Sequence, residues 1–429
     1  MLTKRSSGFW LCVVLLVSCG ASVVMAPDGG GSAAGGGSAG GESPGGGSAG
    51  GASAGGSAGG ASAGGSAGGA SAGGSAGGAS AGGSAGGASA GGSAGGRVDA
   101  GAPAWEGGLL APPPLPTYSG GTCPTLVSSP FAANARNRNF RSQGDTREFL
   151  VLVPSTYTPT KRYPVVFGYH WLNASATSVV REAQLERTSL AGGLFAEGAV
   201  NQYDFIAVVP ENLEGNRTCP IPWLSGQSAY CFNWPFFEAM SAPKELAFFE
   251  DMLACVGQQF SVDPARVHVF GVSAGGLWTA FLSTTPNVNR VASVMSVSGG
   301  LGQTNVGGVN WRLDFTPQQN KFPAFIVWGG MNDWFPPQVP LLPPVGINFD
   351  DASKRYRDAL RQDNHFVATC MHSGGHAVPT FPAPTDGGTR FPMFWEFFRD
   401  HPYGMPANVS PYRQSGLPRS FPSTCTVVP

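Results

Sequence analysis

The stretch Val262 to Gly276 (VDPARVHVFGVSAGG) predicts a buried strand, a sharp turn that carries a serine, and the start of a helix. The apolar, partly β-branched run Val267 to Phe270 suits a strand buried within a sheet. Gly271 and Gly275 would remove side chains where a tight turn passes close to its neighbours. This order of elements is the layout of a nucleophile elbow, with Ser273 exposed at the tip of the turn.

The Gly-x-Ser-x-Gly pattern alone does not identify a nucleophile in this chain. The segment from about Gly29 to Gly96 matches it repeatedly, for example at Gly36 to Gly40 and at Gly51 to Gly55. Among these matches only Ser273 lies between an apolar strand and a helix, which we expect over Leu277 to Ser283. The context of Ser273, and not the pattern, makes it a candidate nucleophile.

A flexible tether is predicted to precede the folded part of the chain. Residues 29–96 are nearly pure Gly, Ser and Ala, repeat the nonapeptide GGASAGGSA, and carry no large apolar side chain that could form a core. A coil of about 68 such residues spans roughly 45 Å. We assign residues 20–121 to this tether and residues 122–429 to one domain, which is long enough for a sizeable core.

The N-terminus resembles an export signal. Lys4 and Arg5 precede an apolar run from Phe9 to Val17, which is too short to cross a membrane but typical of a secretory signal. The end of this run resembles a bacterial lipobox, in which Cys19 would be lipidated and become the mature N-terminus. Cleavage after Ala26 is the alternative. We therefore expect an exported protein of the cell envelope or cell surface, residues 1–19 being the signal, or otherwise a secreted protein.

Cysteine usage agrees with export. Beyond the N-terminal segment the sequence contains six cysteines: Cys123, Cys219, Cys231, Cys255, Cys370 and Cys425. An even number in an oxidising compartment predicts disulfides, but six cysteines allow 15 pairings and the sequence does not choose among them.

Composition also narrows the partners. The formal net charge is −1 and the Lys and Arg residues are scattered, so we do not expect a nucleic acid partner. None of the cysteines has the C-x-x-C spacing of a zinc site, and we expect neither a metal nor an organic cofactor. We expect a monomer that is attached to a membrane only through its N-terminal lipid.

Strand-like and helix-like segments alternate from Arg147 onward. Strands are expected at residues 148–154, 163–169, 204–210, 267–270, 292–297, 324–328 and 366–371. Helices are expected at residues 243–260, 277–283, 352–361 and 394–400. This alternation, with continuously apolar strands, predicts an α/β fold that has a mostly parallel central sheet and helices on both faces. In such a sheet, functional sites lie at the carboxyl ends of the strands.

A base and an acid for Ser273 are found in the order that α/β-hydrolases use. A serine nucleophile needs a base to accept its proton and an acid to orient that base. Asp333 follows the expected strand 324–328, and His376 lies in a Gly-rich loop after the expected strand 366–371. The order Ser, Asp, His, with each residue after a strand, is that of the α/β-hydrolase fold.

Other residues compete for these roles. Asp350 and Asp351 are alternatives for the acid, but they sit just before a predicted helix and resemble N-caps. Asp363 falls near the end of that helix, away from a strand end. His372 is the alternative base, and its spacing from His376 would suit a metal pair on a helix, although two intervening glycines make a helix there unfavourable.

Acyl transfer also needs donors for the developing oxyanion. The first is expected to be the backbone N–H of Ala274, which follows the nucleophile. The second is expected in the loop after strand 163–169, which reads His170-Trp171-Leu172-Asn173-Ala174-Ser175.

Several motifs in this chain occur together in one enzyme family. They are Leu152-Val153-Pro154, Tyr157, Tyr163-Pro164, His170-Trp171, the helix and elbow from Glu245 to Gly276, Cys370, Gly374-Gly375-His376 and Pro379. Over about Arg147 to Pro402 the chain resembles the secreted α/β-hydrolase esterases grouped as polyhydroxybutyrate depolymerase-like and feruloyl esterase-like enzymes.

The resemblance implies a carboxylic ester hydrolase that works through an acyl-enzyme. Ser273 would be the nucleophile, His376 the base and Asp333 the acid. The substrates would be polyesters or feruloyl-type or acetyl-type esters, polymeric or derived from plant cell walls. One departure is Trp171, which stands where the family has glycine, so Trp171 and Leu172 both remain candidates for the second oxyanion donor.

Aromatic residues near these motifs are candidates for substrate binding. The stretch Cys219 to Phe237 carries five Trp and Phe residues, Trp234 among them, and is expected to form a lid or a wall; packing of these rings in the core is the alternative. Trp334 and Phe335, next to Asp333, are the better placed pocket residues, and His170 is a further candidate.

Two other functions are compatible with the sequence. The first is a non-catalytic binding module on a degenerate hydrolase fold, held at the surface to bind polymer or glycan. The second is a serine peptidase of the same fold, because a fold does not fix its substrate.

Overall fold

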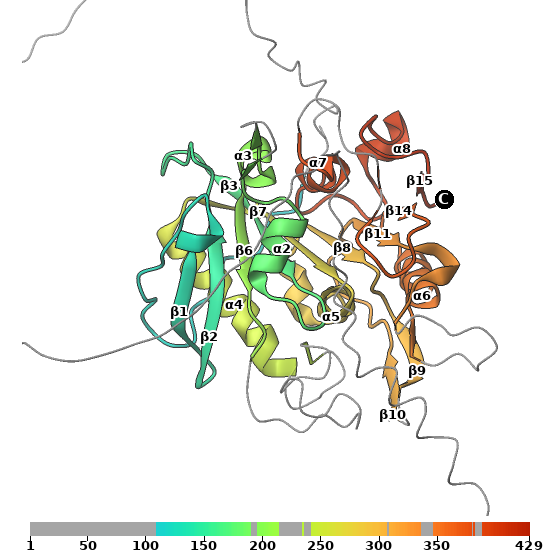
Figure 1. The fold of residues 1–429 in the computed structure, drawn as a ribbon, viewed down its shortest axis with the longest axis horizontal. Helices are drawn as coiled ribbons and strands as arrows, with labels where there is room; N and C mark the ends of the chain where they lie inside the picture. The colour runs from blue at the N-terminus through green and yellow to red at the C-terminus, as the bar shows by residue number, and fades with distance from the viewer. Residues whose placement is uncertain are drawn as a thin grey trace, which may run out of the picture. The chain divides into compact units, whose positions relative to one another are not determined.

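Figure 1 shows the computed structural model of the protein. The chain divides into two compact units, Met1–Val98 and Asp99–Pro429, and the described residues belong to the second. These residues are 109–189, 195–213, 234–235, 242–306, 309–335, 346–379, 381 and 388–429. The predicted signal with Cys19, the repeats of the tether, Cys219 and Cys231 lie outside the described residues.

A nine-stranded sheet organises the described part of the second unit, in the order β1-β2-β6-β3-β7-β8-β11-β14-β15 (Figure 1). From β6 to β14 in this order, neighbouring strands are parallel. The antiparallel pairs are β1 with β2, β2 with β6, and β14 with β15. The strands are β1 (Arg136–Ser142), β2 (Asp145–Leu152), β3 (Tyr163–Tyr169), β6 (Ile206–Pro210), β7 (Val262–Val272), β8 (Ser293–Val297), β11 (Ala324–Trp328), β14 (Val367–Met371) and β15 (Cys425–Val427).

Helices cover both faces of this sheet, because alternate strand residues point to opposite sides. On one face, Phe167 and Val269 share an apolar core with side chains of α4, α5 and α6. On the other face, Val166 and Phe270 pack with side chains of α2, α3 and α7. The helices are α2 (Ala176–Glu182), α3 (Ala199–Tyr203), α4 (Ala242–Gln259), α5 (Ala274–Leu282), α6 (Phe349–Gln362), α7 (Pro392–Asp400) and α8 (Pro411–Ser415). The predicted α/β-hydrolase architecture is therefore confirmed.

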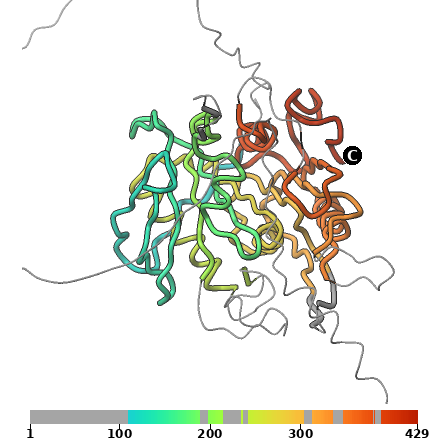
Figure 2. The backbone as a smooth tube through the Cα atoms, in the orientation of Figure 1, coloured from blue at the N-terminus to red at the C-terminus, as the bar shows by residue number. Residues whose placement is uncertain are grey.

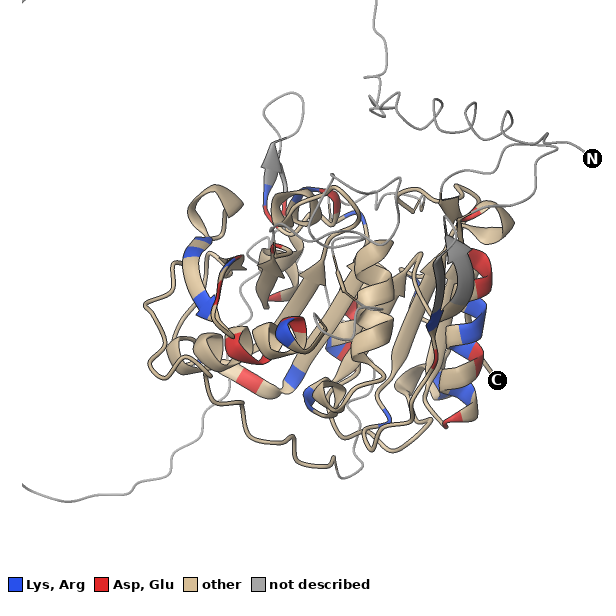
Figure 3. Cartoon of the chain, turned by 90° about the horizontal axis from the view of Figure 1, so that it is seen from below, with Lys and Arg blue, Asp and Glu red and all other residues tan. Residues whose placement is uncertain are grey.

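The composition of the strands explains their central position. Strands β3, β6, β8, β11 and β14 contain no Lys, Arg, Asp or Glu. The central strand β7 has two charged residues, Asp263 and Arg266, both before its buried run that begins at Val267, and many other charged residues lie on helices (Figure 3). A parallel strand that is covered on both faces has no side that could hold a charge in water. The same continuous apolar runs allowed these strands to be predicted from the sequence.

The element boundaries differ from the expectation mainly at strand ends. Strands β3 and β11 coincide with their expected ranges, whereas β7 begins at Val262 and includes Pro264. Edge strands β1 and β15, the short helices α2, α3 and α8, and three two-stranded antiparallel pairs were not predicted from the sequence. These pairs are β4 (Thr188–Ser189) with β5 (Phe195–Ala196), β9 (Gly302–Val306) with β10 (Val309–Leu313), and β12 (Trp334–Phe335) with β13 (Ile347–Asn348).

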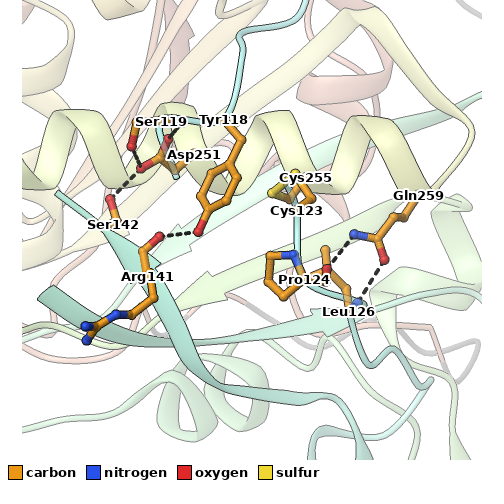
Figure 4. The surroundings of a disulfide bond; sticks show 10 residues. All are labelled: Tyr118, Ser119, Cys123, Pro124, Leu126, Arg141, Ser142, Asp251, Cys255 and Gln259. Carbon is orange, nitrogen blue, oxygen red and sulfur yellow. Dashed lines mark hydrogen bonds between the residues drawn. A yellow bond between two sulfur atoms is a disulfide. The ribbon is translucent and has the colours of Figure 1, made fainter. Parts of the chain in front are cut away.

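A segment before the first strand is tied to α4 (Figure 4). A disulfide joins Cys123 to Cys255 in α4. The Ser119 backbone N–H and the Ser119 hydroxyl each donate a hydrogen bond of 2.7 Å to the Asp251 carboxylate, which is buried. The Tyr118 hydroxyl donates to the carbonyl oxygen of Arg141 at 2.6 Å. This segment, residues 109–128, is called the N-terminal strap below.

The strap corrects the predicted domain boundary. Residues 109–121 were assigned to the tether, but Leu110 N–H donates to Gly404 O at 3.1 Å and Arg290 donates to Pro114 O at 2.6 Å. Tyr118 is buried in the same core as α4. The backbone and side chains of this stretch are bonded to the folded domain, so residues before 122 also belong to the folded part of the chain.

The C-terminal strand returns to the sheet beside β14 (Figure 2). A disulfide joins Cys370 of β14 to Cys425 of β15. Together with the pair Cys123 and Cys255, this settles the partners of four of the cysteines that the sequence left open. No helix among the described residues is long and apolar enough to cross a membrane.

Candidate active site

Ser273 occupies a sharp turn between β7 and α5. Its backbone has φ 55° and ψ −114°, a conformation that residues with a side chain rarely adopt. The turn is held because Ser273 N–H donates to Val297 O at 2.8 Å and Leu277 N–H donates to Ser273 O at 2.9 Å. The strained backbone leaves the Ser273 side chain half-buried at the carboxyl end of β7.

Two glycines make this turn possible. A Cβ atom at Gly271 would lie 2.0 Å from Gly275 O, and a Cβ atom at Gly275 would lie 2.2 Å from Tyr169 O. A side chain at Gly275 would therefore force the turn away from the end of β3, and a side chain at Gly271 would force the end of β7 away from the first turn of α5. The glycines bring Ser273 close to the loop that follows β3.

Asp333 lies after β11, beyond the short 3-10 helix η4 (Gly330–Asn332), and its side chain is completely buried. Oxygen Oδ2 accepts hydrogen bonds from the Ser298 hydroxyl at 2.8 Å and from Gly329 N–H at 2.7 Å. Oxygen Oδ1 faces His376 Nδ1 at 2.7 Å. A buried carboxylate with all of these partners is held in one orientation.

His376 connects Asp333 to Ser273. Its Nε2 lies 2.9 Å from Ser273 Oγ, and its Nδ1 lies 2.7 Å from Asp333 Oδ1. The loops that carry the base and the acid approach closely, because a Cβ atom at Gly329 would lie 1.9 Å from Gly375 O. The three side chains form a continuous chain of hydrogen bonds that can move a proton away from the serine hydroxyl.

The competing acid and base residues lie elsewhere. His372 is buried, accepts a hydrogen bond from Gly374 N–H at 3.2 Å, and lies in a segment of bends with no helix. Burial lowers its pKa. Asp350 bonds to Trp328 and Lys354, and Asp363 bonds to Lys321 and His365.

The expectation that Asp350 and Asp351 are N-caps of α6 is wrong. The N-cap is Asn348, whose side chain accepts from Asp351 N–H. The helix therefore begins at Phe349, earlier than expected, and both aspartates lie in its first turn, where carboxylates are also favourable.

The loop after β3 is fixed by His170. The ring is completely buried, and its Nδ1–H donates to Trp171 O at 2.9 Å while Nε2 accepts from Asn212 N–H at 3.4 Å. Burial lowers the pKa of His170 to about 4, so the ring is neutral at pH 7, as this pattern of one donor and one acceptor requires. Trp234 Nε1–H donates to His170 O at 2.8 Å.

Glu211 supports the same loop from the end of β6. Its Oε2 accepts from Ala176 N–H at 3.0 Å, at the start of α2. Its Oε1 faces Arg136 at 3.2 Å. Neither Glu211 nor Asn212 was noticed in the sequence, because no motif marks a residue that acts through the backbone of another loop.

The residues predicted to bind substrate fall into two groups. His170 and Trp234 are completely buried, and Trp234 packs against Tyr169 and Trp278 in the core. Trp234 therefore follows the alternative that its ring packs internally, and we expect His170 to position its loop and not to touch substrate. Trp334 and Phe335 are half-buried, and the Phe335 ring lies 5.8 Å from that of His376. The rest of the aromatic stretch, except Pro235, lies outside the described residues.

The described residues contain no group of His, Cys, Asp and Glu side chains arranged to hold a metal ion. His372 and His376, the pair considered in the sequence, point to different partners. The polar side chains that the structure brings together are those of Ser273, His376, Asp333 and Ser298.

No protein-family model matches the chain, and no curated protein matches it. Among solved structures, pOPH in complex with DMSO is similar over 69% of this chain and 93% of that chain, with 17% identity and a TM-score of 0.50. The fold is that of the α/β-hydrolases. Native sOPH covers 73% of this chain and 96% of its own, with 17% identity and a TM-score of 0.48. The poly(3-hydroxybutyrate) depolymerase LpqC from Bordetella parapertussis has 18% identity, coverage of 57% and 86%, and a TM-score of 0.38.

Proposed function

We propose that the protein is a serine carboxylic ester hydrolase. The observation that carries this proposal is the hydrogen-bonded chain from Ser273 Oγ through His376 to the buried carboxylate of Asp333, with distances of 2.9 Å and 2.7 Å. The strained backbone of Ser273, which lifts the hydroxyl to the end of β7, supports the same assignment. Ser273 is the nucleophile, His376 the base and Asp333 the acid that orients it.

The reaction follows from these positions. His376 Nε2 takes the proton from Ser273 Oγ as that oxygen bonds to the ester carbonyl carbon, and Asp333 stabilises the imidazolium that forms. His376 then gives the proton to the leaving alkoxide as the ester bond breaks, which leaves an acyl group on Ser273. A water molecule attacks this acyl group by the same route and releases the acid.

Two backbone N–H groups are assigned to the oxyanion. Ala274 is the first residue of α5, so its N–H has no acceptor within the helix. Trp171 O accepts from His170 Nδ1 and from Ala174 N–H. Because the carbonyl and N–H of a trans peptide point in opposite directions, the N–H of Leu172 points away from His170. We therefore assign the second donor to Leu172, and Trp171 to the wall of the site.

The substrate class is proposed from the sequence resemblance. We propose polyester or feruloyl-type or acetyl-type esters, with the half-buried rings of Trp334 and Phe335 beside the acyl group. Disulfides between Cys123 and Cys255 and between Cys370 and Cys425 support an exported protein. Lipidation at Cys19 and a monomeric state complete the proposal.

A substrate panel tests the proposed activity. Protein that begins at Asp99 is assayed with p-nitrophenyl acetate, methyl ferulate, poly(3-hydroxybutyrate) and a peptide p-nitroanilide. We expect hydrolysis of at least one ester and none of the peptide, with loss of about 10³-fold or more in kcat for His376→Gln. His365→Gln is the control, because His365 is also buried but is bonded to Phe322 O and to Asp363 and does not contact Ser273. Folded protein that hydrolyses no ester would contradict the proposal and favour a binding module, and peptide hydrolysis would favour a peptidase.

A further inference from the structure

The imidazole of His376 lies face to face with the ring of Phe349. The two ring centroids are 4.3 Å apart and the planes are inclined by 15°. Phe349 is 1% exposed and belongs to the main apolar core, so its ring is held by the surrounding packing. On the same histidine, Phe335 is more distant, at 5.8 Å and 52°.

Phe349 is also attached to the residue that orients His376. Its backbone N–H donates to Asp333 O at 2.8 Å. It is the first residue of α6, directly after the N-cap Asn348, which pairs with Trp334 in the hairpin of β12 and β13. The stacked ring and the acid of the triad are therefore held by one local piece of structure.

This stacking has a chemical consequence. The face of an aromatic ring carries partial negative charge, so it attracts a cation placed within about 6 Å of its centroid. During the proposed reaction His376 becomes an imidazolium, and the Phe349 face lies where that charge develops. The buried ring also fills the space beside the imidazole that water would otherwise occupy.

We propose that Phe349 is a positioning residue for the base: it fixes the plane of the His376 imidazole and stabilises the imidazolium that forms when Ser273 loses its proton. This inference rests on the proposed hydrolase function. Among the described residues, titratable side chains near His376 include Asp333, which is bonded to it, and the buried His372. Neither is altered by a substitution at position 349.

The test compares Phe349→Leu with Phe322→Leu. Phe322 is the matched control because it is also 1% exposed, lies in the same core, and has its ring centroid 4.3 Å from a histidine, His365, which does not contact Ser273. Both variants are measured for the free energy of unfolding in urea and for kcat and KM on the best ester across pH. Phe349→Met is carried as a second apolar variant, so the comparison does not depend on one side chain.

For Phe349→Leu we expect kcat to fall by about 5- to 30-fold while KM changes little. The acid limb of the kcat/KM profile should move to lower pH by roughly 0.5 to 1 unit, because an imidazolium without the ring face loses its proton more easily. Phe349→Tyr, which keeps the ring face, should restore most of kcat and the position of the limb. Phe322→Leu should lower the free energy of unfolding and leave both kcat and the position of the acid limb unchanged.

Two results would overturn the inference. In the first, Phe349→Leu and Phe322→Leu have equal kcat and equal pH profiles. In the second, kcat falls in Phe349→Leu and Phe349→Met but the acid limb stays in place, which would limit Phe349 to packing. Neither result affects the hydrolase assignment, which is contradicted by other outcomes, such as folded wild-type protein that hydrolyses no ester or a His376→Gln variant with full activity.

Discussion

Ser298 and Asp333 are joined by a hydrogen bond of 2.8 Å between the serine hydroxyl and Asp333 Oδ2. Ser298 follows β8 and Asp333 follows β11, so the bond connects the carboxyl ends of two neighbouring strands. Because Oδ2 is taken by Ser298 and by Gly329 N–H, Oδ1 is left to face His376. The orientation of the acid thus depends on a residue that no motif contains.

Removal of the Ser298 hydroxyl should therefore weaken catalysis. We expect Ser298→Ala to lower kcat by about 10-fold, since a hydrogen bond to a charged group contributes roughly 1.5 to 3 kcal/mol. The matched control is Ser296→Ala, because the Ser296 hydroxyl is also buried but donates to Gly276 O at 3.0 Å. The test is the steady-state kcat of the two variants. Equal kcat values for Ser298→Ala and Ser296→Ala would show that the hydrogen bond from Ser298 to Asp333 has no role in the reaction.

Catalysis should depend on the hydrogen bond by which the Nδ1–H of His170 holds the loop after β3. His170→Leu removes the N–H that fixes Trp171 O and should lower kcat by about 10- to 100-fold through misplacement of the Leu172 N–H. His170→Asn keeps an N–H near the position of Nδ1 and should retain more activity. Full activity in His170→Leu would contradict the assignment of this loop to the oxyanion site.

Much of this site could be predicted from the sequence, because its main residues stand next to strands. Ser273, Asp333 and His376 each follow a continuous apolar strand, and parallel strands bring their carboxyl ends together. Ser298 and Phe349 were not predicted, since their roles depend on contacts between segments that are distant in the chain. The N-cap of α6 was predicted at the wrong residue. Asn348, two residues before Asp350, occupies the N-cap position, which both asparagine and aspartate favour.

The packing of single aromatic and polar residues was the least predictable part. For Trp234 the sequence left two interpretations open, a lid or wall of the site and packing in the core, and the ring is buried in the core. Sequence alone does not show where a core has space for a large ring. Residues 109–121 of the strap were assigned to the tether because their contacts come from Tyr118, which bonds to β1, and Ser119, which bonds to α4, and these residues carry no periodic pattern.

The buried histidines should make the protein sensitive to acid. Burial lowers the pKa of His170 and His401 to about 4 and lowers those of the other three buried histidines below 6.5; these three are His268, His365 and His372. The unfolded chain binds protons at these side chains below about pH 6.5 and the folded chain does not until lower pH, so stability falls as the pH falls through this window. For His170 and His401 the full effect is roughly 3 kcal/mol each.

Urea unfolding at pH 7.5 and pH 5.0 measures this dependence. We expect the free energy of unfolding to be several kcal/mol lower at pH 5.0, and His401→Gln, which does not titrate, to reduce the difference. Equal stability of the wild-type protein at the two pH values would contradict the prediction.

The N-terminal strap should be needed for stability. Protein that begins at Thr122 loses both hydrogen bonds from Ser119 to the buried Asp251 carboxylate. Its free energy of unfolding in urea should be lower than that of protein that begins at Asp99 by roughly 3 kcal/mol or more. Ser119→Ala in the longer protein removes only the hydroxyl and should cost about half as much. The strap is dispensable if the two proteins unfold at the same urea concentration.

Covalent labelling of Ser273 tests the central claim most directly. Wild-type protein and Ser273→Ala are treated with a fluorophosphonate, and intact mass and peptide mapping are recorded after confirming that both are folded. We predict one phosphonyl group per wild-type chain, located at Ser273, and none on Ser273→Ala, together with loss of ester hydrolysis. Equal labelling of both proteins, or hydrolysis by Ser273→Ala at the wild-type rate, would show that Ser273 is not the nucleophile.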